Sequence, residues 1–391
     1  MSLSEGGTHS VWNRLSVCSF VGIAAASFWS TAVVECAAVL AVTGSIFHWK
    51  RSRELARRFR VPLILWISYL IAVIVSVIAS PYRAESLSSL SIHWHALLFP
   101  AFLLTQFTRR DMTFIATTMI SSAALAAVVT ILHRLVVNGH FIDPYFIGVT
   151  TFADLAVLTL LVDLGFLLLR ETESPDAISN GRFIIVSLIP IAISVFWSTL
   201  KGPVIALVMG SFGLVSWLRP RALVWWAVGV VLLVALSPDV LLQKMEWFAT
   251  GGNLDRYTLW DAGRSLLPGL PPFGYGPGSF HHILPAEASL AFTGKPPSTW
   301  HNDYLQTALE SGWVVGALYV AFVAVVGARL LVRPPEKKGL RIMLVVLLSC
   351  FVSFSTIGSV LTSSILSVVW WCTLGIIAQF CWKDFGHEFT Q

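Results

Sequence analysis

The chain has 391 residues, of which 56% are hydrophobic and only 12% are charged. A soluble globular domain is about half apolar and about a quarter charged, so this sequence has too few charged residues to cover a soluble protein of its length. Apolar runs of about 18–20 residues recur along the chain, and each is long enough to cross a ~30 Å hydrocarbon core. Composition therefore excludes a soluble protein and predicts an all-α polytopic membrane protein.

The apolar runs predict about twelve transmembrane helices. Two short spans share residues 15–48 and are separated near residues 29–31. The others are expected at about 61–80, 87–107, 112–133, 150–169, 183–200, 203–218, 222–238, 304–332, 341–357 and 360–381. One long loop lies between the ninth and tenth predicted spans. The expected organisation is a bundle over 1–238, a loop with amphipathic helices over 239–303, and the rest of the bundle over 304–391.

The formal net charge of +5 comes from Lys and Arg residues in short clusters between apolar runs. Such clusters mark the cytoplasmic side of a membrane protein. With twelve spans, the clusters near 50–60, 109–110, 219–221 and 333–341 all fall on one side. Both termini are therefore expected in the cytoplasm and the loop 239–303 on the opposite face. The charge predicts membrane lipids as partners and does not indicate nucleic acid.

Cysteine and histidine spacing predicts no metal site. The five cysteines lie in or at the ends of apolar runs, without disulfide or zinc spacing. His281 and His282 have no carboxylate or cysteine at ligand spacing, and the sequence has no Asp-x-Asp pair of the kind that holds a metal and a nucleotide sugar. We therefore expect neither a metal nor a cofactor.

Several ionisable residues lie inside or between the predicted spans, where they cost a few kcal/mol on insertion scales and are candidates for function. Asp154 lies at the outer end of its span, where it can face a cavity. For Asp163, nine residues deeper, and for Glu35, a carboxylate bonded between helices is the favoured interpretation. Lys201 precedes Gly202 and Pro203 in a predicted tight turn on the outer side. Its ammonium can bind a lipid phosphate or simply reach the headgroups.

The long loop contains two further patterns. Residues 255–264 read as an amphipathic helix in which Arg256 and Arg264, about two turns apart, can share one face and offer planar forks to phosphate oxygens. The glycines at 274, 276 and 278 predict a non-helical turn with close backbone approach. They do not form a nucleotide fingerprint, because no strand precedes them.

His301, where the loop meets the next span, is the candidate for acid–base chemistry. An ordinary histidine pKa near 6.5 lets the imidazole accept a proton at neutral pH. Asn302 or Asp303 can orient it, although no spacing establishes this. The alternative is an interfacial histidine at a span entrance.

Three motifs in this region together resemble the O-antigen ligase/polymerase superfamily of bacterial membrane proteins. They are R-x-x-x-W at 256–260, F-G-x-G-P-G-x-F at 273–280 and H-N-x-Y-L-Q-x-x-x-E-x-G at 301–312. The stretch T-F-A-D-L-A at 151–156 resembles the ligase branch, and Lys201-Gly202 occupies the place of the family's Arg-Gly. The resemblance is close over about 150–320 and extends to the rest of the chain by topology.

The resemblance implies a reaction at the periplasmic face of the bacterial inner membrane. The donor would be an undecaprenyl-diphosphate-linked glycan and the acceptor a sugar hydroxyl of lipid A–core. His301 falls on the catalytic histidine, and Arg256 and Lys201 fall on the two diphosphate-binding positions. A lysine at 201 keeps the charge but loses the bidentate fork.

Two rival functions follow from the same sequence. A polymerase of the superfamily would use a second lipid-linked glycan as acceptor. A transporter or flippase would often show two related halves around a midplane site. No half-to-half similarity is visible here, and the long loop follows the ninth predicted span, which weighs against transport.

Overall fold

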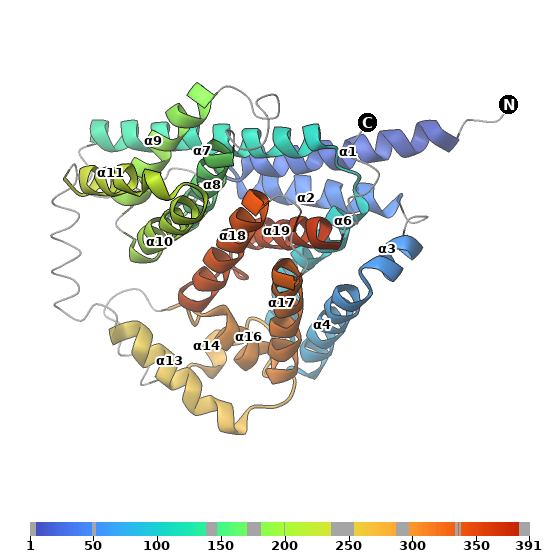
Figure 1. Cartoon of the computed structure of the whole chain (residues 1–391). Helices are drawn as coiled ribbons and strands as arrows, with labels where there is room; N and C mark the ends of the chain where they lie inside the picture. Colours follow the sequence, from blue (N-terminus) through green and yellow to red (C-terminus); the bar gives the residue numbers. More distant parts are fainter. Residues whose placement is uncertain are drawn as a thin grey trace.

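The computed structural model describes residues 5–48, 52–137, 147–169, 181–198, 200–235, 254–286, 297–332, 335 and 338–382. Across these residues the regular elements are helices, and none of the described segments is a strand. The all-α fold class is therefore confirmed for the part of the chain that is described. Figure 1 shows the helices in sequence colours.

The first half of the chain contains α1 (Glu5–Ala26), α2 (Thr31–Ile46), α3 (Ser52–Arg58), α4 (Arg60–Ala79), α5 (Arg83–His93), η2 (Trp94–Leu97), α6 (Leu98–Leu104), α7 (Arg109–Val137) and α8 (Val149–Leu169). The predicted break between the first two spans is confirmed. Ser30 is the N-cap of α2, and its side chain accepts a hydrogen bond from the Val33 N–H at 3.3 Å.

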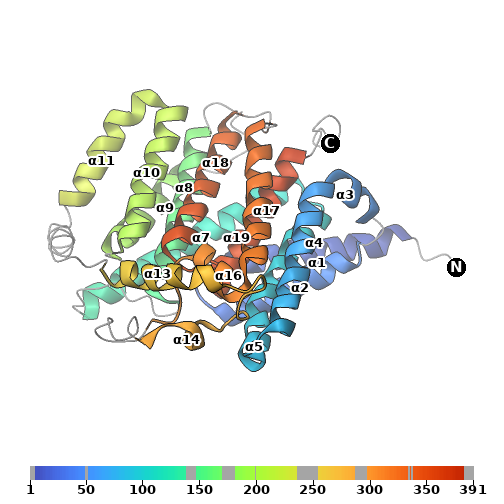
Figure 2. The same cartoon turned by 90° about the horizontal axis from the view of Figure 1, so that it is seen from below.

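The second half contains α9 (Gly181–Trp197), α10 (Lys201–Leu218), η4 (Pro220–Ala222), α11 (Leu223–Ala235), α13 (Leu254–Leu266), η5 (Leu267–Gly269), α14 (Phe280–Ile283), α16 (Asp303–Ser311), α17 (Trp313–Val332), α18 (Lys338–Ile357) and α19 (Ser364–Trp382). In Figure 2, α13 lies across the ends of the upright helices, with α14 and α16 beside it.

Seven helices of the described chain are long and apolar enough to cross a membrane. They are Arg60–Ala79, Arg83–Leu104, Arg110–Val136, Val149–Leu168, Trp313–Val332, Lys338–Ile357 and Ser364–Trp382. Five shorter apolar helices occupy the positions of further predicted spans: Val11–Ala26, Thr31–Ile46, Ile185–Trp197, Gly202–Leu218 and Pro220–Leu232. A multi-pass membrane protein is confirmed, and the number twelve stays a prediction.

The predicted span 304–332 is wrong, because the structure divides it into α16 and α17. The division falls at Gly312, whose φ is 93°. A side chain there would overlap the backbone of Pro272 and Phe273, so the chain bends around the glycine-rich segment. The nine-residue α16 is amphipathic and belongs with the loop, while the membrane helix begins at Trp313.

The glycine-rich segment has the conformation that its sequence predicted. Gly274, Gly276 and Gly278 all have positive φ values, of 64°, 100° and 80°. A Cβ at Gly274 would overlap the backbone at the α16–α17 bend, and one at Gly276 would overlap the hydroxyls of the α4–α5 region. The segment is therefore wedged between two parts of the bundle.

A small apolar core of its own holds the loop helices together. Its buried members are Leu259 of α13, Phe280 of α14, Trp300 and Leu309 of α16. The Phe280 and Trp300 rings meet edge to face with centroids 5.0 Å apart. The predicted amphipathic helix at 255–264 is thus confirmed as α13, with its apolar face on this core.

Candidate active site at the α18–α19 connector

Two polar residues of the loop, Arg256 and Thr299, contact the end of α18 and the connector that joins α18 to α19, residues 358–363. Arg256 Nη1 donates to the carbonyl of Ile357, the last residue of α18, at 2.8 Å. A carbonyl at a helix C-terminus lacks an intrahelical partner and carries partial negative charge, so an arginine stabilises it. Next to it, the hydroxyls of Thr299 and Ser359 lie 2.9 Å apart. These contacts attach both α13 and the segment before His301 to the bundle.

His301 itself has an unusual backbone. Its φ of 49° is the one positive value among described residues other than glycine. The residue before it is fixed, because Trp300 is buried and its carbonyl accepts a hydrogen bond from Trp260 Nε1 at 2.9 Å. The His301 N–H points to Thr299 Oγ1 at 3.4 Å. Left-handed backbone at a non-glycine residue costs about 1–3 kcal/mol and persists only where its surroundings hold it, often at functional sites.

The electrostatics of His301 suit a base. Burial, and secondly the positive charge of Arg256, lower its pKa below the ordinary value of 6.5. At neutral pH the imidazole is therefore uncharged and able to accept a proton.

Asn302 and Asp303 both accept hydrogen bonds from backbone N–H groups. The Asn302 side chain caps α16 by accepting from the Leu305 N–H at 2.9 Å. Asp303 accepts from the N–H groups of Val360 at 2.9 Å and Leu361 at 3.2 Å. Burial raises the pKa of Asp303 to about 7, against the effect of these hydrogen bonds. These contacts fix where α16 starts, and the expectation that one of the two residues orients the ring stays a prediction.

Asp154 approaches the site from inside the bundle. It is buried near the outer end of α8, where Thr151 Oγ1 lies 3.3 Å from Ser363 Oγ of the connector. Burial lowers the pKa of Arg256, and the charge of Asp154 opposes that shift, which shows that the two groups interact. The structure therefore brings Asp154, Arg256 and His301 into one electrostatic neighbourhood.

The position of Lys201 in the fold is given by its backbone, which begins α10. The predicted tight turn is wrong in detail, because Lys201, Gly202 and Pro203 form the first turn of α10. Proline is tolerated there, since the N–H it lacks would have no helical partner. A Cβ on Gly202 would lie 3.0 Å from Cδ1 of Ile357, the residue whose carbonyl binds Arg256. The start of α10 thus adjoins the same connector.

Arg264 is engaged elsewhere. Its Nη1 lies 2.7 Å from Asp261 Oδ1 in an exposed pair on α13. The opposite side of this turn is packed, since a Cβ on Gly263 would touch Trp300 and Leu305. The structure therefore does not join Arg264 to the contacts of Arg256, and its role in phosphate binding stays a prediction.

The other ionisable residues predicted inside spans have partners within the bundle. His95 Nε2 lies 3.0 Å from Glu35. Ser187 donates to Asp163 at 2.7 Å. Among the described residues no group of three His, Cys, Asp or Glu side chains is arranged to hold a metal ion.

Sequence reasoning missed two parts of this site. The connector 358–363 was predicted as a gap of two residues between spans, although its sequence G-S-V-L-T-S, with four turn-favouring residues, was a visible signal of a longer turn. Glu310 belongs to the motif at 301–312, but the sequence assigned it no role. Its buried carboxylate accepts a hydrogen bond from the Gly278 N–H, which ties the end of α16 to the glycine-rich segment.

Glu310 gives a pH-dependent prediction. Burial raises its pKa from 4.5 to about 7, so its contribution to stability is present at low pH and is lost as the pH rises through about 7. Its second oxygen and the amide oxygen of Gln306, one turn earlier, are both buried without a partner among the described residues. Glu310→Gln supplies a neutral donor at this place. We expect its melting temperature to match wild type near pH 5 and to exceed it near pH 8, measured by thermal unfolding in detergent. Equal melting curves at pH 8 would contradict the assignment.

The fold and the site define a class of protein: a multi-pass helical membrane protein with a histidine and an arginine held at one end of its bundle. A family model described as O-Antigen ligase matches residues 184–320, roughly a third of the chain. This segment includes Lys201, Arg256, His301 and Glu310. The search of curated proteins found no match. The match over residues 184–320 supports the superfamily that the motifs resemble.

Proposed function

We propose that the chain is an O-antigen ligase-like glycosyltransferase. It moves a glycan from undecaprenyl diphosphate to a sugar hydroxyl of lipid A–core at the periplasmic face of the inner membrane. The observation that carries the proposal is the setting of His301. Its backbone is held in a left-handed conformation, and burial and Arg256 lower its pKa. Both residues lie inside the segment that matches the ligase family.

The proposed reaction needs one general base and cationic side chains that bind the diphosphate. The His301 imidazole takes the proton of the acceptor hydroxyl as its oxygen attacks the anomeric carbon of the donor sugar. The bond from that carbon to the diphosphate oxygen breaks, and the electron pair leaves with undecaprenyl diphosphate. Arg256, by a planar fork, and Lys201, by a point charge, stabilise the charge on the leaving group. No cofactor takes part in these steps.

The test is a product assay with purified protein in lipid vesicles. The vesicles carry an undecaprenyl-diphosphate-linked glycan and lipid A–core, and products are separated by gel and mass spectrometry. We expect glycan joined to lipid A–core. Elongated lipid-linked glycan without joining would instead identify a polymerase. Movement of the donor between leaflets without any transfer would identify a carrier and overturn the proposal.

A further inference from the structure

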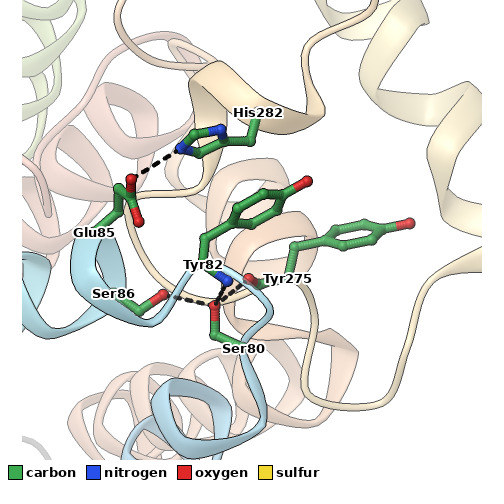
Figure 3. A network of polar contacts seen from close by, with 6 residues as sticks. All are labelled: Ser80, Tyr82, Glu85, Ser86, Tyr275 and His282. Carbon is green, nitrogen blue, oxygen red and sulfur yellow. Dashed lines mark hydrogen bonds and ion pairs between the residues drawn. The ribbon is translucent and has the colours of Figure 1, made fainter.

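Two surface segments far apart in the chain meet in a polar and aromatic cluster outside the site described so far. One is the α4–α5 turn with Ser80 and Tyr82, followed by Glu85 in the first turn of α5. The other is the glycine-rich segment and α14, with Tyr275 and His282. Figure 3 shows these residues together, with the imidazole of His282 lying over the ring of Tyr82.

A single hydroxyl fixes both tyrosines. Ser80 Oγ donates to the carbonyl of Tyr275 at 2.6 Å and accepts from the Tyr82 N–H at 2.9 Å. Ser86 Oγ donates to Ser80 Oγ at 2.8 Å. Gly276 has no side chain to block this approach. The backbones that carry the two rings are therefore held together by hydrogen bonds, which is a form of preorganisation that favours binding.

The cluster combines flat apolar faces with hydrogen-bonding groups. The Tyr82 and His282 rings are stacked, with centroids 4.2 Å apart and an interplanar angle of 8°. His282 Nε2 lies 3.3 Å from Glu85 Oε1, and both side chains are more than a third exposed. Both phenol hydroxyls point away from the serine cluster (Figure 3) and have no protein partner among the described residues. Donors and acceptors are thus available beside the rings.

This combination fits a sugar better than a phosphate or a lipid chain. A pyranose presents a face of C–H groups to an aromatic ring and a rim of hydroxyls to carboxylate, imidazole and phenol groups. Glu85 repels an anion, whereas in the proposed reaction the diphosphate is bound by the cation of Arg256. An acyl chain would leave the exposed carboxylate without a partner.

The cluster also lies within reach of His301. Glu310, near the end of α16, binds the Gly278 N–H between Tyr275 and His282, and His301 lies just before the start of α16. A nine-residue helix is about 13 Å long, which a few linked sugar units span.

We propose that Tyr82, Tyr275, His282 and Glu85 form a saccharide subsite that holds sugar units of a glycan substrate away from the reacting bond. This subsite rests on the proposed transfer reaction. The sugar units belong either to the donor glycan or to the core oligosaccharide of the acceptor, and both present the same chemistry.

The first experiment measures transfer kinetics with each substrate varied in turn. Tyr82→Ala and Tyr275→Ala are expected to raise KM about tenfold for one glycan substrate and leave kcat near wild type. The substrate whose KM rises identifies the source of the sugar. Tyr275→Phe keeps the ring, so its KM should stay within about twofold of wild type.

Glu85→Gln, an exposed change, should raise the same KM severalfold even if the alanine variants fold poorly. Trp313→Ala, an exposed aromatic at the start of α17, is the matched control. An unchanged KM for both substrates in all variants would overturn the subsite and leave the rings as interfacial anchors.

The second experiment does not require transfer. Saturation-transfer NMR on the purified protein uses two probes, free core oligosaccharide and a delipidated fragment of the O-glycan. Signal to one probe that falls in Tyr82→Ala supports the subsite, and no signal to either probe contradicts it. Because this binding does not need His301, failure of the proposed reaction and failure of the subsite are distinguishable.

Discussion

Replacing His301 with alanine is expected to abolish glycan transfer while the protein still inserts and folds. Loss of a positioned general base typically lowers the rate by 10²–10⁴-fold. The measurement is complementation of a ligase-deficient strain together with the vesicle assay of the purified variant. Restoration of normal capped lipopolysaccharide by His301→Ala would show that the proposed mechanism is wrong.

The backbone at this position calls for a matched control. Because the φ of His301 is 49°, alanine both removes the base and strains the left-handed conformation. Asparagine tolerates that conformation better than alanine does but is not a base at neutral pH. We expect His301→Asn to be as inactive as His301→Ala and to melt closer to wild type. An active asparagine variant would assign the histidine a structural role.

Replacing Lys201 with alanine is expected to remove most of the activity, and Lys201→Arg is expected to keep it. A hydrogen bond to a charged group contributes about 1.5–3 kcal/mol, which corresponds to a loss of roughly 10–100-fold. The location supports this size of effect. Lys201 begins α10, and the next residue, Gly202, lies beside Ile357, whose carbonyl accepts a hydrogen bond from Arg256. The N-terminus of α10 adds its own partial positive charge toward a phosphate.

The control for Lys201 is another lysine at the start of a membrane helix. Lys338 begins α18 at the end remote from the connector, and Lys338→Ala should leave kcat/KM for the donor within about twofold of wild type. Full activity in Lys201→Ala would show that Lys201 does not bind the diphosphate and that its ammonium simply reaches the lipid headgroups.

The helices were predictable where one physical signal dominates. Long apolar runs determine where membrane helices lie, so α4, α7, α8, α18 and α19 agree with the predicted spans to within several residues. The exception is instructive. α16 joins directly to an apolar run, so its amphipathic nine residues were read as part of the next span. Only the bend at Gly312, imposed by contact with a segment 38 to 40 residues earlier, separates the two helices.

The site was predictable in its residue types but not in its connections. His301 and Arg256 carry recognisable chemistry, and the structure relates them through charge. The partners of Arg256 and Asp303 are backbone groups of residues 357, 360 and 361. Backbone groups have no sequence signature, and these lie more than 50 residues away along the chain. Sequence therefore suggested Asp303 as a partner of the histidine ring, when its hydrogen bonds go to the connector.

The connector has one further consequence. It joins α18 and α19, both of which are long and apolar enough to span the bilayer. Its residues 360 and 361 bind Asp303 of α16, and Ile357 just before it binds Arg256 of α13. A membrane thicker or thinner than these helices is accommodated by tilt. Any tilt of α18 against α19 moves the anchors of Arg256 and Asp303 relative to each other. A change in bilayer thickness is therefore expected to alter the geometry around His301, and lipid chain length is a variable to control in the transfer assay.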